Sequence, residues 1–207
     1  MKILLTGFEP FGKSDLNPSE IIVHTLAERA MPGIQLATAI LPVDLDRGPA
    51  ALLQVLDASQ PQAVVCLGLA AQRTSISLER VAINLLDFRI PDNAGVQVND
   101  QAIVADGPAA YFTTLPLRAM QAAIQQAGIP AELSLSAGSY LCNQVTYILL
   151  HYLATQSQNI PAGFIHLPFL PEQVAQQPRP AASMSLDNMT RAIEIALQVL
   201  AGEGQVD

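Results

Sequence analysis

The sequence has no tryptophan, only two cysteines and few charged residues. Two cysteines cannot build the disulfide framework of a small secreted domain. Charged residues make up 14% of the 207 positions, against roughly 25% in an average soluble protein, while half of the residues are hydrophobic. This balance excludes intrinsic disorder and implies a sizeable buried core. The length fits a single domain over 1–207.

Positive charge is scarce as well. Lys and Arg number 10 against 18 Asp and Glu, which gives a formal net charge of −8. The basic residues are scattered singly from Lys2 to Arg191. Because no basic patch is present to follow a phosphate backbone, we expect no nucleic-acid partner.

Long hydrophobic runs are also absent. The longest apolar segment, 63–71, is about half the ~20 residues that a membrane-spanning helix needs. The first apolar run ends at Leu5, which is too short for the core of a signal peptide. We therefore expect a cytoplasmic protein with reduced thiols and no membrane partner.

Strand-like apolar segments alternate along the chain with segments of helical periodicity. Asn17, with Pro18 at the first helical position, is typical of a helix start, and Ser185 of another. The alternation predicts an α/β fold, a three-layer α/β/α sandwich whose mostly parallel, twisted sheet has helices on both faces. Strands are predicted at 2–6, 34–41, 63–68, 131–136 and 162–167, and helices from 18 and at 47–56, 116–127, 141–154 and 186–200.

The middle of the chain departs from this alternation. Segment 75–84 alternates as one strand, and 91–95 (PDNAG) is typical of a turn. The apolar residues after the turn predict short hairpin strands, so we expect a small β-hairpin excursion from the main sheet. These residues are Val96, Val98, Ile103 and Val104.

A cysteine follows the predicted strand 131–136, at the start of the next helix. The connecting loop contains Gly138 and places Cys142 in the first helical turn. Unpaired backbone amides and the helix dipole there favour a thiolate, and the same amides can bind an oxyanion. The alternative is that Cys142 is a small buried hydrophobic residue, the role that we expect for Cys66 within strand 63–68.

A thiol nucleophile needs a base, and the chain offers three histidines. His151 lies nine residues beyond Cys142 on the same predicted helix, so it points to the opposite side. His24 lies inside the first helix. His166 ends a predicted strand at the edge of the sheet where Cys142 is expected, and it is therefore the best candidate for the base.

The base usually needs a third group that fixes its tautomer. Glu79 lies in an alternating apolar segment, where it shares the face of Val81 and Ile83, and a carboxylate in such a place requires a partner. An ion pair with a nearby arginine is the alternative role. The loop carboxylates Asp87, Asp92 and Asp100 are typical of turns and solvent-exposed positions.

Other classes of site find little support. Segment 6–12 (TGFEPFG) lacks the glycine pattern of a nucleotide-binding loop, and this disfavours a phosphate-dependent transferase. Its two aromatic residues, Phe8 and Phe11, are suited to wall a small apolar pocket. The isolated histidines have no metal-ligand spacing, so no metal site and no cofactor is predicted.

Five blocks of sequence, taken in order, resemble pyroglutamyl peptidase type I, a family of cysteine exopeptidases also called pyrrolidone-carboxylate peptidase. The resemblance covers essentially the whole chain. The blocks are 6–12 (TGFEPFG) with 17–19 (NPS), 79–84 (ERVAIN), 89–93 (RIPDN), 137–143 (AGSYLCN) and 166–168 (HLP).

The resemblance implies hydrolytic removal of N-terminal pyroglutamyl (5-oxoproline) residues from peptides, without metal or organic cofactor. It also implies that Cys142 is the nucleophile, that His166 is the general base and acid, and that Glu79 orients His166. Arg89 is implied near the scissile carbonyl. Members of the family are commonly homotetramers, so a tetramer or dimer is expected. The implied lactam pocket consists of Phe8, Phe11, Asn17, Ile90, Tyr140 and Leu141.

The sequence departs from the family pattern in two places. Lys13 stands where a second glycine is usual, and 68–73 (GLAAQR) replaces a more typical GQAGGR. Leu69 thus removes a polar contact near the mouth of the site, for which Gln72 is placed to compensate. We expect an active enzyme with altered affinity. The alternative is a catalytically weak or inactive homologue that binds small molecules on the same fold.

Overall fold

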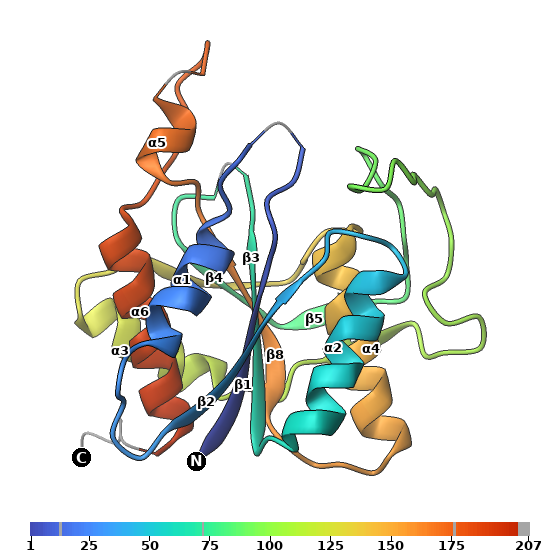
Figure 1. Ribbon diagram of the computed structural model, residues 1–207, viewed down its shortest axis with the longest axis horizontal. Coiled ribbons are helices and arrows are strands. Elements are labelled where there is room, and N and C mark those ends of the chain that lie inside the picture. Colours follow the sequence, from blue (N-terminus) through green and yellow to red (C-terminus); the bar gives the residue numbers. More distant parts are fainter. Residues whose placement is uncertain (13, 72, 176, 203–207) are drawn as a thin grey trace.

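A six-stranded sheet runs through the middle of the protein (Figure 1). The computed structural model describes residues 1–12, 14–71, 73–175 and 177–202. The sheet order is β2-β1-β3-β8-β4-β7, and its first four strands are mutually parallel, whereas β4 runs antiparallel to β8 and parallel to β7. The strands are β1 (Lys2–Phe8), β2 (Gln35–Leu41), β3 (Ala63–Leu69), β4 (Ile76–Glu79), β7 (Ala131–Ser134) and β8 (Ala162–Leu167).

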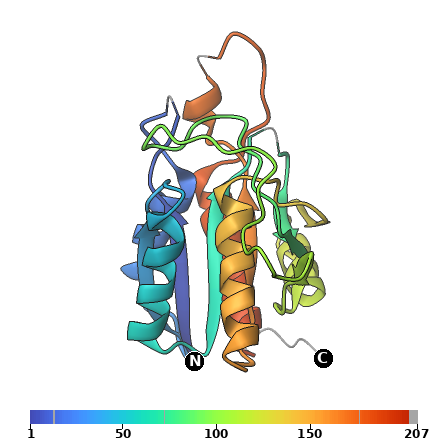
Figure 2. The ribbon, with the colours of Figure 1, turned by 90° about the vertical axis from the view of Figure 1, so that its right-hand side faces the viewer.

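Helices cover both faces of this sheet, as Figures 1 and 2 show. One face packs against α1 (Pro18–Ala27), α3 (Leu117–Gln126) and α6 (Leu186–Leu200). The other packs against α2 (Arg47–Ser59) and α4 (Leu141–Thr155). The predicted three-layer α/β/α sandwich with a mostly parallel sheet is thereby confirmed. A further short helix, α5 (Pro171–Val174), was not predicted.

The core lies in two layers because successive side chains of a strand point to opposite faces. In β3, Val65 and Leu67 belong to the α1/α3/α6 side, whereas Val64 and Cys66 belong to the α2/α4 side. All four are 0% exposed, and burying a side chain such as valine or leucine contributes about 1.5–3 kcal/mol. The central strand is therefore fixed from both sides.

The predicted ends of the regular elements agree with the structure to within a few residues. The side chain of Asn17 accepts a hydrogen bond from the backbone N–H of Ser19 at 3.1 Å, and Ser185 caps α6 through Asn188 N–H at 3.3 Å. Gly128 follows α3 with φ +79°, the left-handed conformation that ends many helices. The sequence cues for helix ends were thus reliable here.

The predicted excursion is only partly correct. Segment 75–84 is not one strand, because it breaks at Arg80 into β4 and β5 (Val81–Ile83). Unbroken alternation predicted that Glu79 shares the face of Val81 and Ile83. Because the strand breaks at Arg80, this prediction does not hold. Strand β5 pairs with β6 (Ala110–Phe112), which was not predicted, to form a two-stranded antiparallel sheet beside α4.

The hairpin strands predicted around Val96 and Val104 are wrong, since both residues lie in irregular loop. A few backbone hydrogen bonds, such as the two between Leu86 and Gln101, and several side chains hold this loop in place of a continuous ladder. Asp92 accepts hydrogen bonds from the backbone N–H groups of Ala94 and Val96, and Asn84 accepts one from that of Val104 at 2.9 Å. The turn at 91–95 does form, with Gly95 at φ +84°.

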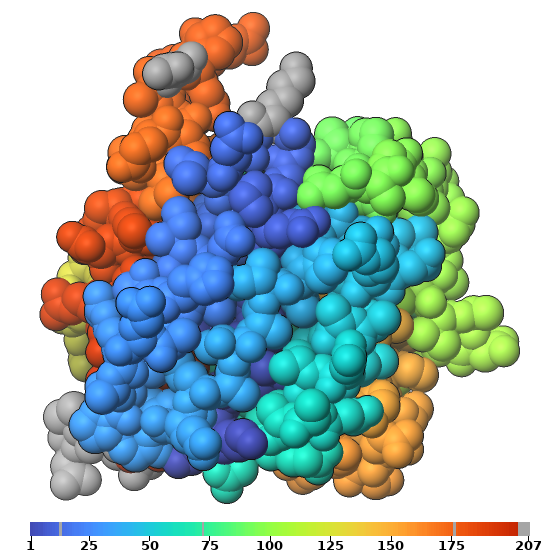
Figure 3. All heavy atoms as spheres, in the orientation of Figure 1, coloured from blue at the N-terminus to red at the C-terminus, as the bar shows by residue number. Residues whose placement is uncertain are grey.

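The carboxyl ends of β1, β3 and β8 meet at one edge of the sheet, which is where ligands bind in open α/β folds. The amino terminus of α4 lies at the same edge. In Figure 3 the segment after β8 (orange) and the loop around residue 95 (green) rise on either side of the segment that follows β1 (dark blue). Among the described residues, no helix is both long and apolar enough to cross a membrane.

Candidate active site

A cavity of about 610 Å³ opens at this carboxyl edge. Nine of the ten predicted site residues line it, and Glu79 lies behind one of them, His166. The nine are Phe8, Phe11, Asn17, Arg89, Ile90, Tyr140, Leu141, Cys142 and His166.

His166 is paired with a buried carboxylate. Its Nδ1 atom lies 2.8 Å from Oε1 of Glu79, and the two residues are 4% and 1% exposed. Because a carboxylate only accepts, Nδ1 carries the proton and Nε2 is left as the free, basic nitrogen. Oε1 of Glu79 also lies 3.6 Å from Nη2 of Arg73. The two partners considered for Glu79, a histidine and an arginine, therefore both lie against its carboxylate.

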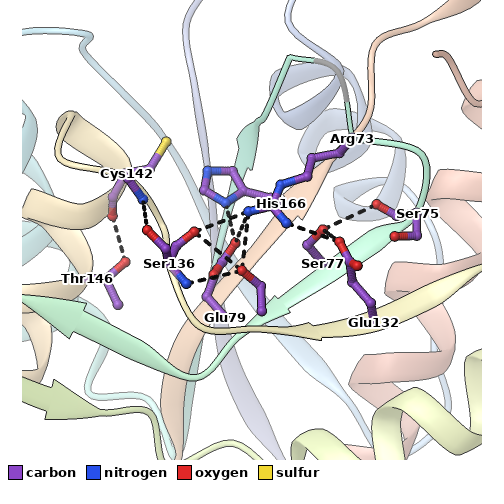
Figure 4. A network of polar contacts seen from close by, with 11 residues as sticks. Arg73, Ser75, Ser77, Glu79, Glu132, Ser136, Cys142, Thr146 and His166 are labelled. Atoms are coloured by element: carbon purple, nitrogen blue, oxygen red, sulfur yellow. Dashed lines mark hydrogen bonds and ion pairs between the residues drawn. The ribbon is translucent and has the colours of Figure 1, made fainter. Parts of the chain in front are cut away.

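Cys142 is the second residue of α4, and its sulfur lies close to strand β3. A Cβ atom added at Gly68 would lie 2.9 Å from this sulfur and 2.7 Å from Cζ of Phe164. Gly68 is the direct neighbour of His166 in the β3–β8 register. The sulfur thus occupies space that a side chain at position 68 would fill. Figure 4 shows Cys142 directed toward the imidazole of His166.

Two features of the site work against the thiolate form of Cys142. Burial, and then the charge of Glu79, raise the pKa of its thiol to about 12. The backbone amide at the helix terminus lowers this pKa, as expected, but burial outweighs it. Burial likewise raises the pKa of the Cys66 thiol to about 12, in keeping with its expected core position.

Hydrogen bonds fix the amino end of α4. Asn143 is fully buried, and its side chain accepts from Ile83 N–H and donates to the carbonyls of Ile83 and Leu85. In the preceding loop, Gly138 has φ +80° and the Ser139 hydroxyl donates to the carbonyl of Asp87 at 2.8 Å. Cys142 is therefore held between the two-stranded sheet and the main sheet.

Aromatic side chains form the wall of the cavity. The rings of Phe88 and Tyr140 meet edge to face with centroids 4.5 Å apart, and Phe11 lies 6.4 Å from Tyr140. The Tyr140 hydroxyl donates to the carbonyl of Pro91 at 3.2 Å. Asn17 also lines the cavity, but its amide is already bonded to Ser19 and to the carbonyl of Glu9.

The remaining histidines, and the positions that depart from the family pattern, were also considered for the site. His151 faces Tyr111, whose hydroxyl lies 2.9 Å from its Nδ1, and neither His151 nor His24 lines the cavity. Leu69 does line it. Lys13 and Gln72 lie outside the described residues. In the part of the chain that the structure describes, no group of three or more His, Cys, Asp or Glu side chains is arranged to hold a metal ion.

Sequence reasoning missed several residues of the site, above all Arg73. Arg73 is the last residue of the block 68–73, which resembles the family pattern in part. Its role could not be inferred from this position, because its contacts are with residues of β4 and β7. Val43, Ala70, Ala71, Asp87 and Ser136 also line the cavity.

A cysteine that points from a helix terminus toward a carboxylate-paired histidine, on an α/β sheet, is the arrangement of a cysteine hydrolase. The model of the family described as pyroglutamyl peptidase matches residues 1–203, and the chain belongs to this family. The predicted resemblance is confirmed.

Named relatives agree with this assignment. The chain is 48% identical to the pyrrolidone-carboxylate peptidase of Gloeobacter violaceus, over 100% of both chains. It is 46% identical to that of Vibrio vulnificus, over 95% of this chain and 91% of the relative. Among solved structures, pyroglutamyl peptidase I of Bacillus amyloliquefaciens matches with a TM-score of 0.93 at 39% identity, covering 99% of both chains. The pyrrolidone carboxyl peptidase of Thermococcus litoralis matches with a TM-score of 0.93 at 40% identity, covering 97% and 93%.

Proposed function

We propose that the protein hydrolyses the amide bond that follows an N-terminal pyroglutamyl residue of a peptide. The observation that carries this proposal is the meeting of Cys142 and the Glu79-paired His166 at one cavity, in a chain of the pyroglutamyl peptidase family. Similarity to enzymes along the whole chain does not favour the alternative of a binding protein without catalysis.

In the first step, His166 acts as the general base. Its Nε2 takes the thiol proton of Cys142, and the sulfur attacks the pyroglutamyl carbonyl carbon. The C–N bond then breaks, His166 returns the proton to the leaving amine, and a thioester remains on Cys142. Glu79 stabilises the imidazolium that forms between these events.

In the second step, His166 takes a proton from water, which attacks the thioester carbon. The C–S bond breaks, the thiolate recovers its proton, and pyroglutamate leaves. Backbone amides at the amino end of α4 are suited to stabilise the oxyanion in both steps, with Arg89 near the scissile carbonyl.

Specificity follows from the chemistry of the pocket. Pyroglutamate carries a flat, uncharged lactam, which suits the walls made by Phe8, Phe11, Ile90, Tyr140 and Leu141. A free N-terminal glutamine brings a cationic amine, which would lose its hydration in this site. The cavity of about 610 Å³ also has room for the peptide beyond the lactam ring.

The organisation of the protein belongs to the same proposal. The two core layers on one sheet support a single domain over 1–207. Family resemblance supports a homo-oligomer, a tetramer or a dimer, with which the 14% of charged residues is compatible. A cytoplasmic location belongs to the same proposal. The solution mass tests the oligomeric state, and a purely monomeric protein would contradict it.

The function is tested by hydrolysis of a pyroglutamyl arylamide by the wild-type protein, Cys142→Ser and Cys66→Ser. We expect Cys142→Ser to lose about 10³-fold or more in kcat/KM while Cys66→Ser keeps most of its activity. Circular dichroism confirms that both variants fold. Wild-type activity in Cys142→Ser contradicts the mechanism, and a wild-type protein that binds the lactam without turnover contradicts the function.

A further inference from the structure

Arg73 joins four groups of the site through one guanidinium. Its Nη1 donates to Oε1 of Glu132 at 3.1 Å, and its Nη2 donates to the Ser134 hydroxyl at 3.2 Å and to the Ser136 carbonyl at 3.1 Å. Nη2 also lies 3.6 Å from Oε1 of Glu79. Figure 4 shows Arg73 between the Glu79–His166 pair and Glu132. The side chain thus connects the catalytic carboxylate with the loop that leads to Cys142.

Arg73 and His166 share one oxygen atom of Glu79. Oε1 lies 2.8 Å from His166 Nδ1 and 3.6 Å from Arg73 Nη2. The side chain of Glu79 is 0% exposed, whereas that of Arg73 is 31% exposed. A buried carboxylate needs opposite charge close by. Among the described residues, Arg73 and His166 lie within ion-pair distance of Glu79, and of these two Arg73 carries a permanent positive charge.

The charge of Arg73 acts on the thiol proton of Cys142 with a definite sign. A nearby positive charge makes the loss of this proton easier, whereas the charge of Glu79 makes it harder. Arg73 therefore opposes the effect of Glu79 on the thiol.

Other charged groups near Arg73 do not cancel this effect. Glu132, on β7, is half-exposed. Its carboxyl pKa lies below the usual value, mainly because the Ser77 hydroxyl donates to it at 2.7 Å and to a smaller extent because of Arg73. Water therefore screens its negative charge more than that of Glu79. Asp87 and Arg89, at the wall of the cavity, are exposed and opposite in sign.

We propose that Arg73 is a positioning residue of this site, which offsets the charge of Glu79 and so sets the pH range in which the Cys142–His166 pair reacts. This inference rests on the proposed function. Through its bond to the Ser136 carbonyl, Arg73 also ties the loop that carries the nucleophile to the strand that carries Glu79.

The test is the rate at which iodoacetamide alkylates Cys142 between about pH 5 and about pH 10, read by mass spectrometry at the Cys142 peptide. The variants are Arg73→Gln, Arg73→Lys and Glu132→Gln. For Arg73→Gln we expect the profile to move to higher pH by about one unit, which is about tenfold in proton affinity. Arg73→Lys keeps the charge and should stay close to wild type. Glu132→Gln removes negative charge and should move the profile slightly to lower pH.

An unchanged profile in Arg73→Gln overturns the proposal, and so does an equal upward shift in Arg73→Lys, because charge would then not be the cause. If Arg73→Gln fails to fold by circular dichroism, Arg73→Lys decides: a wild-type profile supports the proposal and a shifted profile overturns it. Alkylation requires no turnover of substrate. A protein that hydrolyses no pyroglutamyl arylamide would therefore contradict the proposed function without deciding the role of Arg73.

Discussion

The middle of β3 and the amino end of α4 each hold a cysteine on the same side of the sheet, yet only one of the two thiols is placed for chemistry. Cys66 is 0% exposed and packs among core side chains, whereas Cys142 lines the cavity with His166. Burial raises the pKa of both thiols to about 12. The thiols therefore differ in access to the cavity and in the presence of a neighbouring histidine.

Removing the base should make Cys142 behave like Cys66. In His166→Gln we expect kcat/KM for a pyroglutamyl arylamide to fall by about 10³-fold or more, because no group is left to take the thiol proton. The matched control is His151→Gln, whose side chain lies against Tyr111 outside the cavity. An equal loss in both variants would show that the effect is structural and not due to the base.

Removing the charge of Glu79 should also reduce the reactivity that distinguishes Cys142 from Cys66. Glu79→Gln keeps the shape of the side chain but can no longer stabilise the imidazolium, so we expect kcat/KM to fall by about 10²-fold or more. Thermal unfolding monitored alongside separates catalysis from stability. Full activity in a folded Glu79→Gln variant would assign the carboxylate to structure alone.

Adding one methyl group to β3 should affect Cys142 more than Cys66. In Gly68→Ala, the new Cβ would lie 2.9 Å from the Cys142 sulfur and 2.7 Å from Phe164. We expect kcat to fall by about tenfold or more from displacement of the sulfur and stability to fall by about 1–3 kcal/mol from overpacking. Cys66→Ala, on the same strand, should lose stability with little change in kcat. Kinetics and urea unfolding of the two variants provide the comparison, and an unchanged kcat in Gly68→Ala would contradict the close contact.

The smallest expected effect concerns stability at alkaline pH. The pKa of the Cys66 thiol is raised from 9.0 to about 12 in the folded protein, so folding favours its protonated form. Its contribution is complete below pH 9 and is lost as the pH rises toward 12, at most about 1.4 kcal/mol for each pH unit. Unfolding in urea as a function of pH should therefore show a shallower decline in Cys66→Ala than in wild type. Parallel curves would show that the pKa of the Cys66 thiol is the same in the folded and the unfolded protein.

The sequence predicted those parts of the site that depend on local pattern. Each of these parts is encoded within a few consecutive residues: the apolar run of β3, the glycine turn before Cys142 and the carboxyl end of β8 near His166. The α/β alternation then predicted the edge of the sheet at which they meet. Family resemblance then added the lactam pocket. The fold class was predictable for the same reason.

The parts that depend on distant contacts were not predictable. The alternation of residues along one segment does not show where a strand ends, as β4 does before Arg80. It also does not show which distant strand will pair with it, as β6 does with β5. Arg73 owes its position to side chains of β4 and β7. The raised pKa of the Cys142 thiol was not predictable either, because helix polarity is visible in a sequence, whereas the degree of desolvation is a property of the folded cavity.

The place of β8 in the sheet links catalysis to the completion of folding. Glu79 and His166 are 87 residues apart in the sequence, and β8 pairs between β3 and β4, which follow each other in the chain. A growing chain has already produced α4, which carries the proposed nucleophile, before β8, which carries the proposed base. Under the proposed mechanism, activity begins only when the centre of the sheet closes, and turnover of substrate reports that this long-range contact has formed.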